Sequence, residues 1–153
     1  MEILSRSTEE TLNVGRHFAH YLKPQDIVAL FGELGSGKTV LVKGIAQGLG
    51  IDKDRINSPT FVLIKQYAGK IPLYHFDLYR LKDLKSIIRL GFEEYFYGQG
   101  ITVVEWADRM KELLPDEYLK IELSIEGENT RRIKFFPQGK KYKVRFKNLA
   151  LLT

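Results

Sequence analysis

One segment constrains the fold of this chain more than any other. It reads Gly32-Glu33-Leu34-Gly35-Ser36-Gly37-Lys38-Thr39 and fills the pattern G-x-x-x-x-G-K-[ST] without a mismatch. The apolar run at residues 26–31 precedes it, as expected of a strand buried on both faces, and helical spacing follows over residues 38–47. Strand, glycine-rich turn and helix in this order predict a phosphate-binding loop in an α/β domain.

The residue types of this loop suit a nucleotide phosphate chain. The glycines let backbone N–H groups turn inward around phosphate oxygens, and the helix N-terminus adds positive potential. Lys38 is predicted to reach the β- and γ-phosphates, and the Thr39 hydroxyl to bind Mg²⁺. The predicted ligand-binding residues of the loop are Glu33, Leu34, Gly35, Ser36, Gly37, Lys38 and Thr39. A dinucleotide-binding turn is excluded, because the third glycine of G-x-G-x-x-G is missing.

Two acids end apolar runs and are candidates for metal binding and for orienting a nucleophile. Asp77 follows the run at residues 73–76, and Glu105 follows the run at residues 101–104. A carboxylate that caps the next helix or faces water is the alternative for either acid. Residues 57–60 lie between the first strand-helix unit and the next strands, where a loop that senses the γ-phosphate is expected, although Ser-Pro-Thr is also common in turns.

The remaining pattern completes the predicted fold. Ser7 and Glu10 form a capping box for a helix to about residue 22, and residues 61–67 and 71–76 suggest a hairpin. Helical spacing over residues 81–96 is interrupted near Gly91. Strands are expected at residues 101–104, 118–125, 132–136 and 142–146. We therefore expect a single domain over residues 1–153, α/β in class and P-loop NTPase-like, with a mixed β-sheet flanked by helices and an antiparallel C-terminal part.

Composition excludes several classes of site. The chain has no cysteine and only three histidines, so thiolate metal sites, disulfides and cysteine nucleophiles are ruled out and a transition-metal site is disfavoured. The histidines are interpreted as surface or satisfied core residues. The single tryptophan, Trp106, is interpreted as a core residue, with an exposed contact as the alternative. No apolar run approaches the roughly 20 residues of a membrane span, and no leader pattern opens the chain, so a cytoplasmic location is expected.

Four strings in this order and spacing resemble the TsaE family: the loop at 32–39, Ser-Pro-Thr-Phe at 58–61, Tyr-His-Phe-Asp-Leu-Tyr-Arg-Leu at 74–81 and Val-Glu-Trp-Ala-Asp at 104–108. Members of that family are the ATPase subunit of the bacterial machinery that makes threonylcarbamoyladenosine on tRNA. The resemblance implies that Thr39 and Glu105 bind Mg²⁺, that Asp77 is an essential acid and that residues 58–61 form a switch-like loop. It also implies that Thr11 and Arg132 flank the adenine of ATP.

By this resemblance, the protein hydrolyses ATP with Lys38, Asp77 and Glu105 as catalytic residues. It docks on TsaD-like and TsaB-like proteins and resets that transferase complex between cycles. Its contact with tRNA is then indirect, and neither DNA nor a membrane is an expected partner. A small-molecule P-loop kinase is the alternative, as is a non-hydrolysing nucleotide-gated scaffold. A GTPase is disfavoured because no Asn-Lys-x-Asp string is present.

The net charge of +5 is unevenly distributed. Residues 131–147 carry eight basic side chains and no acid, which leaves the rest of the chain net acidic. Within the predicted strand, Tyr142, Val144 and Phe146 alternate with Lys143, Arg145 and Lys147. An amphipathic edge strand whose lysines deter pairing explains the pattern, and contact with tRNA phosphates is the alternative.

Overall fold

The computed structural model describes residues 1–57 and 62–149. These residues form one seven-stranded sheet in the order β1-β7-β6-β2-β5-β4-β3. The strands are β1 (Glu2–Ser5), β2 (Ile27–Phe31), β3 (Ile64–Tyr67), β4 (Leu73–Asp77), β5 (Ile101–Glu105), β6 (Tyr118–Ile125) and β7 (Arg131–Gln138). The α-helices of this part are α1 (Thr8–Phe18), α2 (Lys38–Gly48), α3 (Leu84–Arg89), α4 (Phe92–Phe96) and α5 (Gly139–Arg145).

The sheet is mixed, as predicted. Strands β6, β2, β5 and β4 are parallel neighbours. At the edges the pairing is antiparallel: β7 pairs with β6, β1 with β7, and β3 with β4. The parallel strands β2, β4 and β5 are almost wholly buried because helices cover both faces. Strand β1 was not predicted. It pairs with the edge of β7, with Ile3 opposite Ile133.

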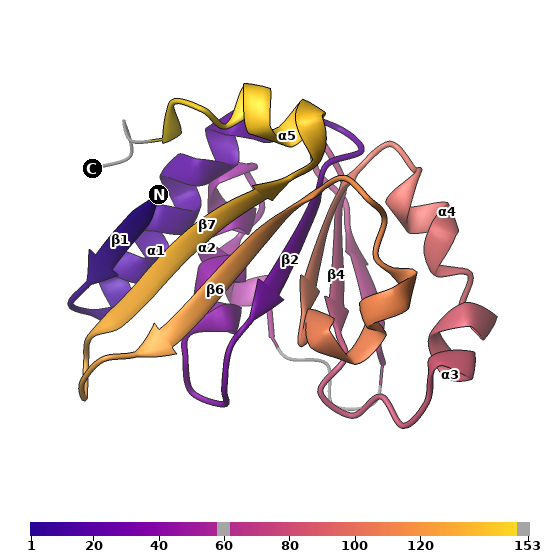
Figure 1. Ribbon diagram of the computed structural model, residues 1–153, viewed down its shortest axis with the longest axis horizontal. Coiled ribbons are helices and arrows are strands. Elements are labelled where there is room, and N and C mark those ends of the chain that lie inside the picture. Colours follow the sequence, from indigo (N-terminus) through magenta and orange to yellow (C-terminus); the bar gives the residue numbers. More distant parts are fainter. Residues whose placement is uncertain (58–61, 150–153) are drawn as a thin grey trace.

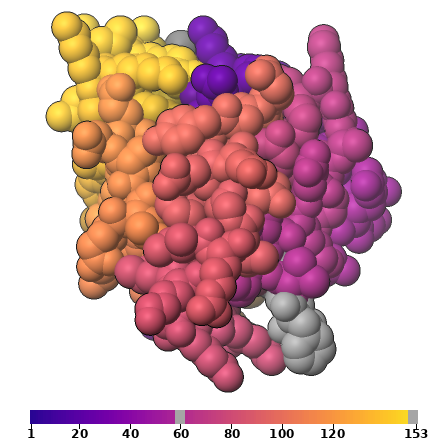
Figure 2. Space-filling view, turned by 90° about the vertical axis from the view of Figure 1, so that its right-hand side faces the viewer, coloured from indigo at the N-terminus to yellow at the C-terminus, as the bar shows by residue number. Residues whose placement is uncertain are grey.

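The helices divide into two layers (Figure 1). Helices α1 and α2 pack on one face, where Phe18, Leu41 and Ile45 join the core cluster. Helices α3 and α4 pack on the other face together with a 3₁₀ helix at Ala107–Leu113, and their cluster includes Phe76 and Phe96. Figure 2 shows the side of the molecule that α3 and α4 cover. In the part of the chain described, no helix has the length and apolar character that a membrane crossing requires.

Helices α1 and α2 approach each other very closely. A Cβ atom built on Gly15 would lie 2.5 Å from the Leu41 carbonyl oxygen, and one built on Gly44 would lie 3.0 Å from the Gly15 Cα. Only glycine leaves room for such a crossing. The N-cap of α1 is as predicted, because the Ser7 hydroxyl accepts from the Glu10 N–H at 3.0 Å.

The prediction of a strand at residues 142–146 was wrong. This segment belongs to α5 and its C-terminal end, after Gly139 turns the chain out of β7 with a φ of +81°. Tyr142 and Phe146, four residues apart, are buried on the helical face, whereas Val144 is 67% exposed. Figure 1 shows α5 at the end of the sheet opposite the glycine-rich loop. The edge-strand interpretation therefore fails.

The basic residues of this segment differ in role. Arg145 forms an ion pair with the buried carboxylate of Asp26, with N–O distances of 2.5 and 2.7 Å. Exposed lysines remain on α5 and just beyond it, at Lys140, Lys141, Lys143 and Lys147. Contact of these lysines with RNA phosphates stays a prediction.

Candidate functional site

The glycine-rich loop connects β2 to α2, as its sequence predicts. Gly37 has a φ of +99° and is the N-cap of α2, so the chain enters the helix from a left-handed conformation that favours glycine. A Cβ on Gly32 would lie 2.5 Å from the Leu123 carbonyl oxygen of β6. Close packing at Gly32 and backbone conformation at Gly37 explain why this loop needs glycine at both positions.

Lys38 lies inside the loop. Its ammonium donates to the carbonyl oxygens of Gly32 and Glu33 at 2.6 and 2.9 Å, and it sits 3.9 Å from the ring centroid of Trp106. Burial lowers the pKa of Lys38 below the ordinary 10.5, an effect that nearby carboxylates, Glu105 first, partly oppose. Trp106 is therefore not a plain core residue. It is half-buried and covers the loop lysine.

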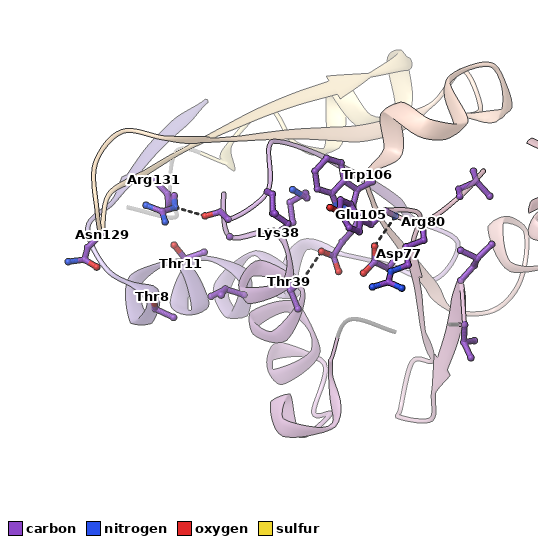
Figure 3. A pocket seen from close by; sticks show the side chains of 18 of the residues that line it. Thr8, Thr11, Lys38, Thr39, Asp77, Arg80, Glu105, Trp106, Asn129 and Arg131 are labelled. Atoms are coloured by element: carbon purple, nitrogen blue, oxygen red, sulfur yellow. Dashed lines mark hydrogen bonds between the residues drawn. The ribbon is translucent and has the colours of Figure 1, made fainter. Parts of the chain in front are cut away.

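The two candidate acids meet beside the loop because their strands are neighbours. In the sheet register Asp77 of β4 lies opposite Glu105 of β5, and Glu105 lies opposite Leu30 of β2. The Thr39 hydroxyl donates to Glu105 Oε1 at 2.7 Å, and both carboxylates are almost completely buried. Figure 3 shows Lys38, Thr39, Asp77 and Glu105 converging on one end of a cavity.

A hydroxyl and a carboxylate oxygen suit Mg²⁺, which takes few protein ligands when a nucleotide supplies phosphate oxygens. Thr39 and Glu105 present these two donors in contact with each other. Among the described residues, no group of three or more His, Asp or Glu side chains forms a self-sufficient metal site. The two oxygen donors therefore fit Mg²⁺ held together with a phosphate ligand.

His75 is a site residue that the sequence interpretation missed. It was expected to be a surface or satisfied core histidine, and it is fully buried on β4. Its Nε2 lies 2.5 Å from Glu105 Oε2, and its Nδ1 has no hydrogen-bond partner among the described residues. The available signal was its place two residues before Asp77, which puts both side chains on one face of the strand.

The cavity has a volume of about 950 Å³ and runs from the acids to the tip of the β6–β7 hairpin. At the far end, Thr8 and Thr11 of α1 form one wall, and Asn129 and Arg131 of the hairpin form the other (Figure 3). The Thr11 hydroxyl shares a 2.7 Å hydrogen bond with the Ser5 hydroxyl. The cavity therefore has a phosphate-sized polar end and a mixed end suited to a base and sugar.

Arg131, and not Arg132, is among the residues that line the cavity. Successive side chains alternate along β7, so Arg132 points away from the face that carries Arg131. Arg132 forms ion pairs with Glu2 and Glu126, whereas Arg131 lines the cavity and donates to the Gly35 carbonyl oxygen at 3.1 Å. Contact of Arg132 with adenine stays a prediction. The switch-like loop expected at residues 58–61 lies outside the described residues.

Comparison with known proteins identifies the family of this chain. The family model described as "Threonylcarbamoyl adenosine biosynthesis protein TsaE" matches residues 5–133. The tRNA threonylcarbamoyladenosine biosynthesis protein TsaE of Bacillus subtilis is 44% identical over 143 residues, or 93% of this chain and 89% of that protein. The protein of the same name from Treponema pallidum is 40% identical over 133 residues, or 87% of this chain and 98% of that protein.

A solved structure gives the same result. The crystal structure of YdiB from Bacillus subtilis superposes with a TM-score of 0.83 at 38% identity, covering 99% of this chain and 94% of that one. Its P-loop NTPase-like fold is also the fold of this protein. The family model spans most of the chain, and the relatives match it over nearly their full length. The chain therefore belongs to the TsaE family.

Proposed function

We propose that this protein binds ATP with Mg²⁺ and hydrolyses it as a component of tRNA threonylcarbamoyladenosine biosynthesis. The observation that carries the proposal is the contact between Thr39 and Glu105 beside the loop lysine, at the polar end of a large cavity. The biosynthetic role follows from family membership, since the relatives are tRNA threonylcarbamoyladenosine biosynthesis proteins.

The phosphate end of the cavity supports three catalytic assignments. Lys38 binds the β- and γ-phosphates, and to do so its ammonium exchanges the carbonyl oxygens of Gly32 and Glu33 for phosphate oxygens. Thr39 and Glu105 would hold Mg²⁺, which when bound neutralises charge on the phosphates. Asp77 faces the same space and helps to orient the attacking water.

The far end of the cavity supports adenine as the base. Thr11 and Arg131 form its two walls, and we propose that Arg131 takes the role expected of Arg132. No residue string of the guanine-reading type accompanies this wall. ATP is therefore the proposed nucleotide.

A further part of the proposal concerns the partner proteins of this chain. We propose that it docks on TsaD-like and TsaB-like proteins, that ATP hydrolysis resets their complex between cycles, and that tRNA is reached through that complex. The cavity is open to solvent beside Tyr79, which is 42% exposed, so a partner protein has access to its phosphate end. Hydrolysis is accordingly expected to be weak without the partners.

The first experiment measures ATP binding and hydrolysis by the full chain, with and without the TsaD-like and TsaB-like proteins. Lys38→Ala should lower ATP affinity roughly 10- to 100-fold, because one or two charge-assisted hydrogen bonds are worth about 1.5–3 kcal/mol. Lys43→Ala is the matched control, since Lys43 lies on the same helix and does not line the cavity. Equal effects of the two substitutions would refute the phosphate-site assignment.

The second experiment tests the pathway. Cells depleted of this protein should lose threonylcarbamoyladenosine from tRNA, and the unmodified gene should restore it, whereas the Lys38→Ala form should not. Release of inorganic phosphate, without a phosphorylated small molecule, distinguishes an ATPase from the alternative P-loop kinase. Normal tRNA modification in depleted cells would remove the biosynthetic role.

A further inference from the structure

The strongest unexplained feature of the site is the contact between His75 and Glu105. His75 is 0% exposed and Glu105 is 2% exposed, and the Nε2–Oε2 distance is 2.5 Å. With Glu105 as a carboxylate, which only accepts hydrogen bonds, the His75 tautomer that fits this contact carries its proton on Nε2 and donates it to Oε2. The other carboxylate oxygen of Glu105 accepts from the Thr39 hydroxyl. Thr39 of α2 thus holds one carboxylate oxygen of Glu105, and His75 of β4 holds the other.

Core packing alone does not explain a histidine at this position. A buried polar atom without a partner costs free energy, and His75 Nδ1 has no partner among the residues that the structure describes. The flanking residues of β4 on the opposite face, Tyr74 and Phe76, belong to an apolar cluster. An aliphatic side chain would fill the position of His75 without burying an unpaired ring nitrogen. What it would not supply is a donor to Glu105.

The geometry also shows what this donor does. Glu105 has three rotatable side-chain bonds, and Thr39 alone fixes only one of its oxygens. The hydrogen bond from His75 fixes the second oxygen and so the plane of the carboxylate. A fixed plane keeps Oε1 directed at Thr39, where the two proposed metal donors meet.

We propose that His75 is a positioning residue that orients Glu105 for divalent-cation binding, an inference that rests on the proposed function. It does not contact the nucleotide cavity itself. Its effect is therefore confined to the cation, and nucleotide binding without a cation does not depend on it. This separation of effects distinguishes positioning from a general role in stability.

The test uses two substitutions with the same amide group. In His75→Gln the amide nitrogen lies about as far from the backbone as Nε2 of histidine, so it can still donate to Glu105. The side chain in His75→Asn is one methylene shorter and does not reach Glu105. Thr102→Val is the control for loss of a buried polar group, because Thr102 lies on the adjacent strand and donates to the Tyr95 carbonyl oxygen instead. Mn²⁺ is the probe, titrated by electron paramagnetic resonance with a non-hydrolysable ATP analogue at saturation.

We expect His75→Asn to raise the Mn²⁺ dissociation constant roughly 10- to 100-fold, the usual effect of losing the partner of a metal ligand. His75→Gln should restore most of that affinity, and Thr102→Val should leave it unchanged. Affinity for the analogue in EDTA should be the same in all four proteins. It can be followed by the fluorescence of Trp106, the single tryptophan.

Each other outcome has a definite meaning. Equal Mn²⁺ affinity in wild type and His75→Asn overturns the positioning role and leaves the proposed function intact. A parallel loss of analogue affinity in EDTA shows a structural role only and also overturns it. If the wild-type protein binds no Mn²⁺ with the analogue, the proposed function itself fails, and the inference fails with it.

Discussion

The ion pair between Arg145 and Asp26 anchors α5 to the start of β2, and we predict that Arg145→Met lowers the free energy of unfolding by about 3 kcal/mol. Both terminal nitrogens of the Arg145 guanidinium donate to the Asp26 carboxylate. The side chain of Arg145 is 17% exposed and that of Asp26 is 1% exposed. Removal of one partner of a buried pair costs about 3–5 kcal/mol. We expect the lower end of that range, because the Lys23 N–H still donates to Asp26 at 2.7 Å.

Chemical and thermal unfolding measure this change directly. A loss of about 3 kcal/mol corresponds to a fall in Tm of roughly 6–12 °C for a chain of this size. Lys143→Met is the matched control on the exposed side of α5, and its effect should stay within about 0.5 kcal/mol. The double variant Asp26→Asn/Arg145→Met should recover much of the lost stability, because no unpaired charge remains buried.

Equal stabilities of Arg145→Met and Lys143→Met would refute this reasoning. That result is what a strand at residues 142–146 with Arg145 turned toward solvent would give. The experiment thus also tests the helical structure of the segment.

The remaining predictions concern the cavity. Glu105→Gln should still bind ATP, but its single-turnover rate of hydrolysis with partners should fall at least about 100-fold, because the amide keeps the shape of the carboxylate and loses its charge. A near-normal rate would contradict the role of Glu105. Since burial lowers the pKa of Lys38, ATP affinity measured by calorimetry should begin to fall at a lower pH than an exposed lysine would give. Arg131→Ala should weaken ATP binding more than Arg132→Ala; the reverse order would restore the original assignment of the base site.

Much of the fold could be predicted because its signals are local. The loop at residues 32–39 and the runs that flank it fix β2, α2 and their connection, and Gly91 marks the break between α3 and α4. Strand β1 lacked such a signal. It is four residues long, and its strand conformation depends on pairing with β7, which lies far away in sequence.

The segment at residues 142–146 shows the limit of pattern reasoning. Its apolar residues alternate, but a short window that holds Tyr142 and Phe146 fits a helical spacing of four equally well. The deciding interactions are tertiary, since the Tyr142 hydroxyl accepts from the Ile27 N–H at 2.8 Å and Arg145 pairs with Asp26. Neither partner is close in sequence.

The candidate site was predictable only in part, because some of its signals are local in sequence and others depend on contacts between distant segments. Residues Lys38 and Thr39 follow from the motif, and strand ends suggested Asp77 and Glu105. The spacing of His75 and Asp77 places both on one face of β4, but it does not reveal the contact of His75 with Glu105 on the neighbouring strand, on which its proposed role depends. The proposed assignment of the base site to Arg131 differs from the predicted Arg132 by one residue, and a step of one residue reverses the face of a strand.

If the proposed function is correct, the glycine crossing of α1 and α2 has a consequence for the thermodynamics of nucleotide binding. Thr11 stands on one helix and Thr39 on the other, and the contact at Gly15 and Gly44 brings their backbones together without intervening side chains. We therefore expect folding to preorganise the two ends of the cavity, so that a bound nucleotide loses little binding free energy in ordering them. The calorimetric entropy of binding should accordingly change when Gly44→Ala separates the helices, even if every contacting residue is unaltered.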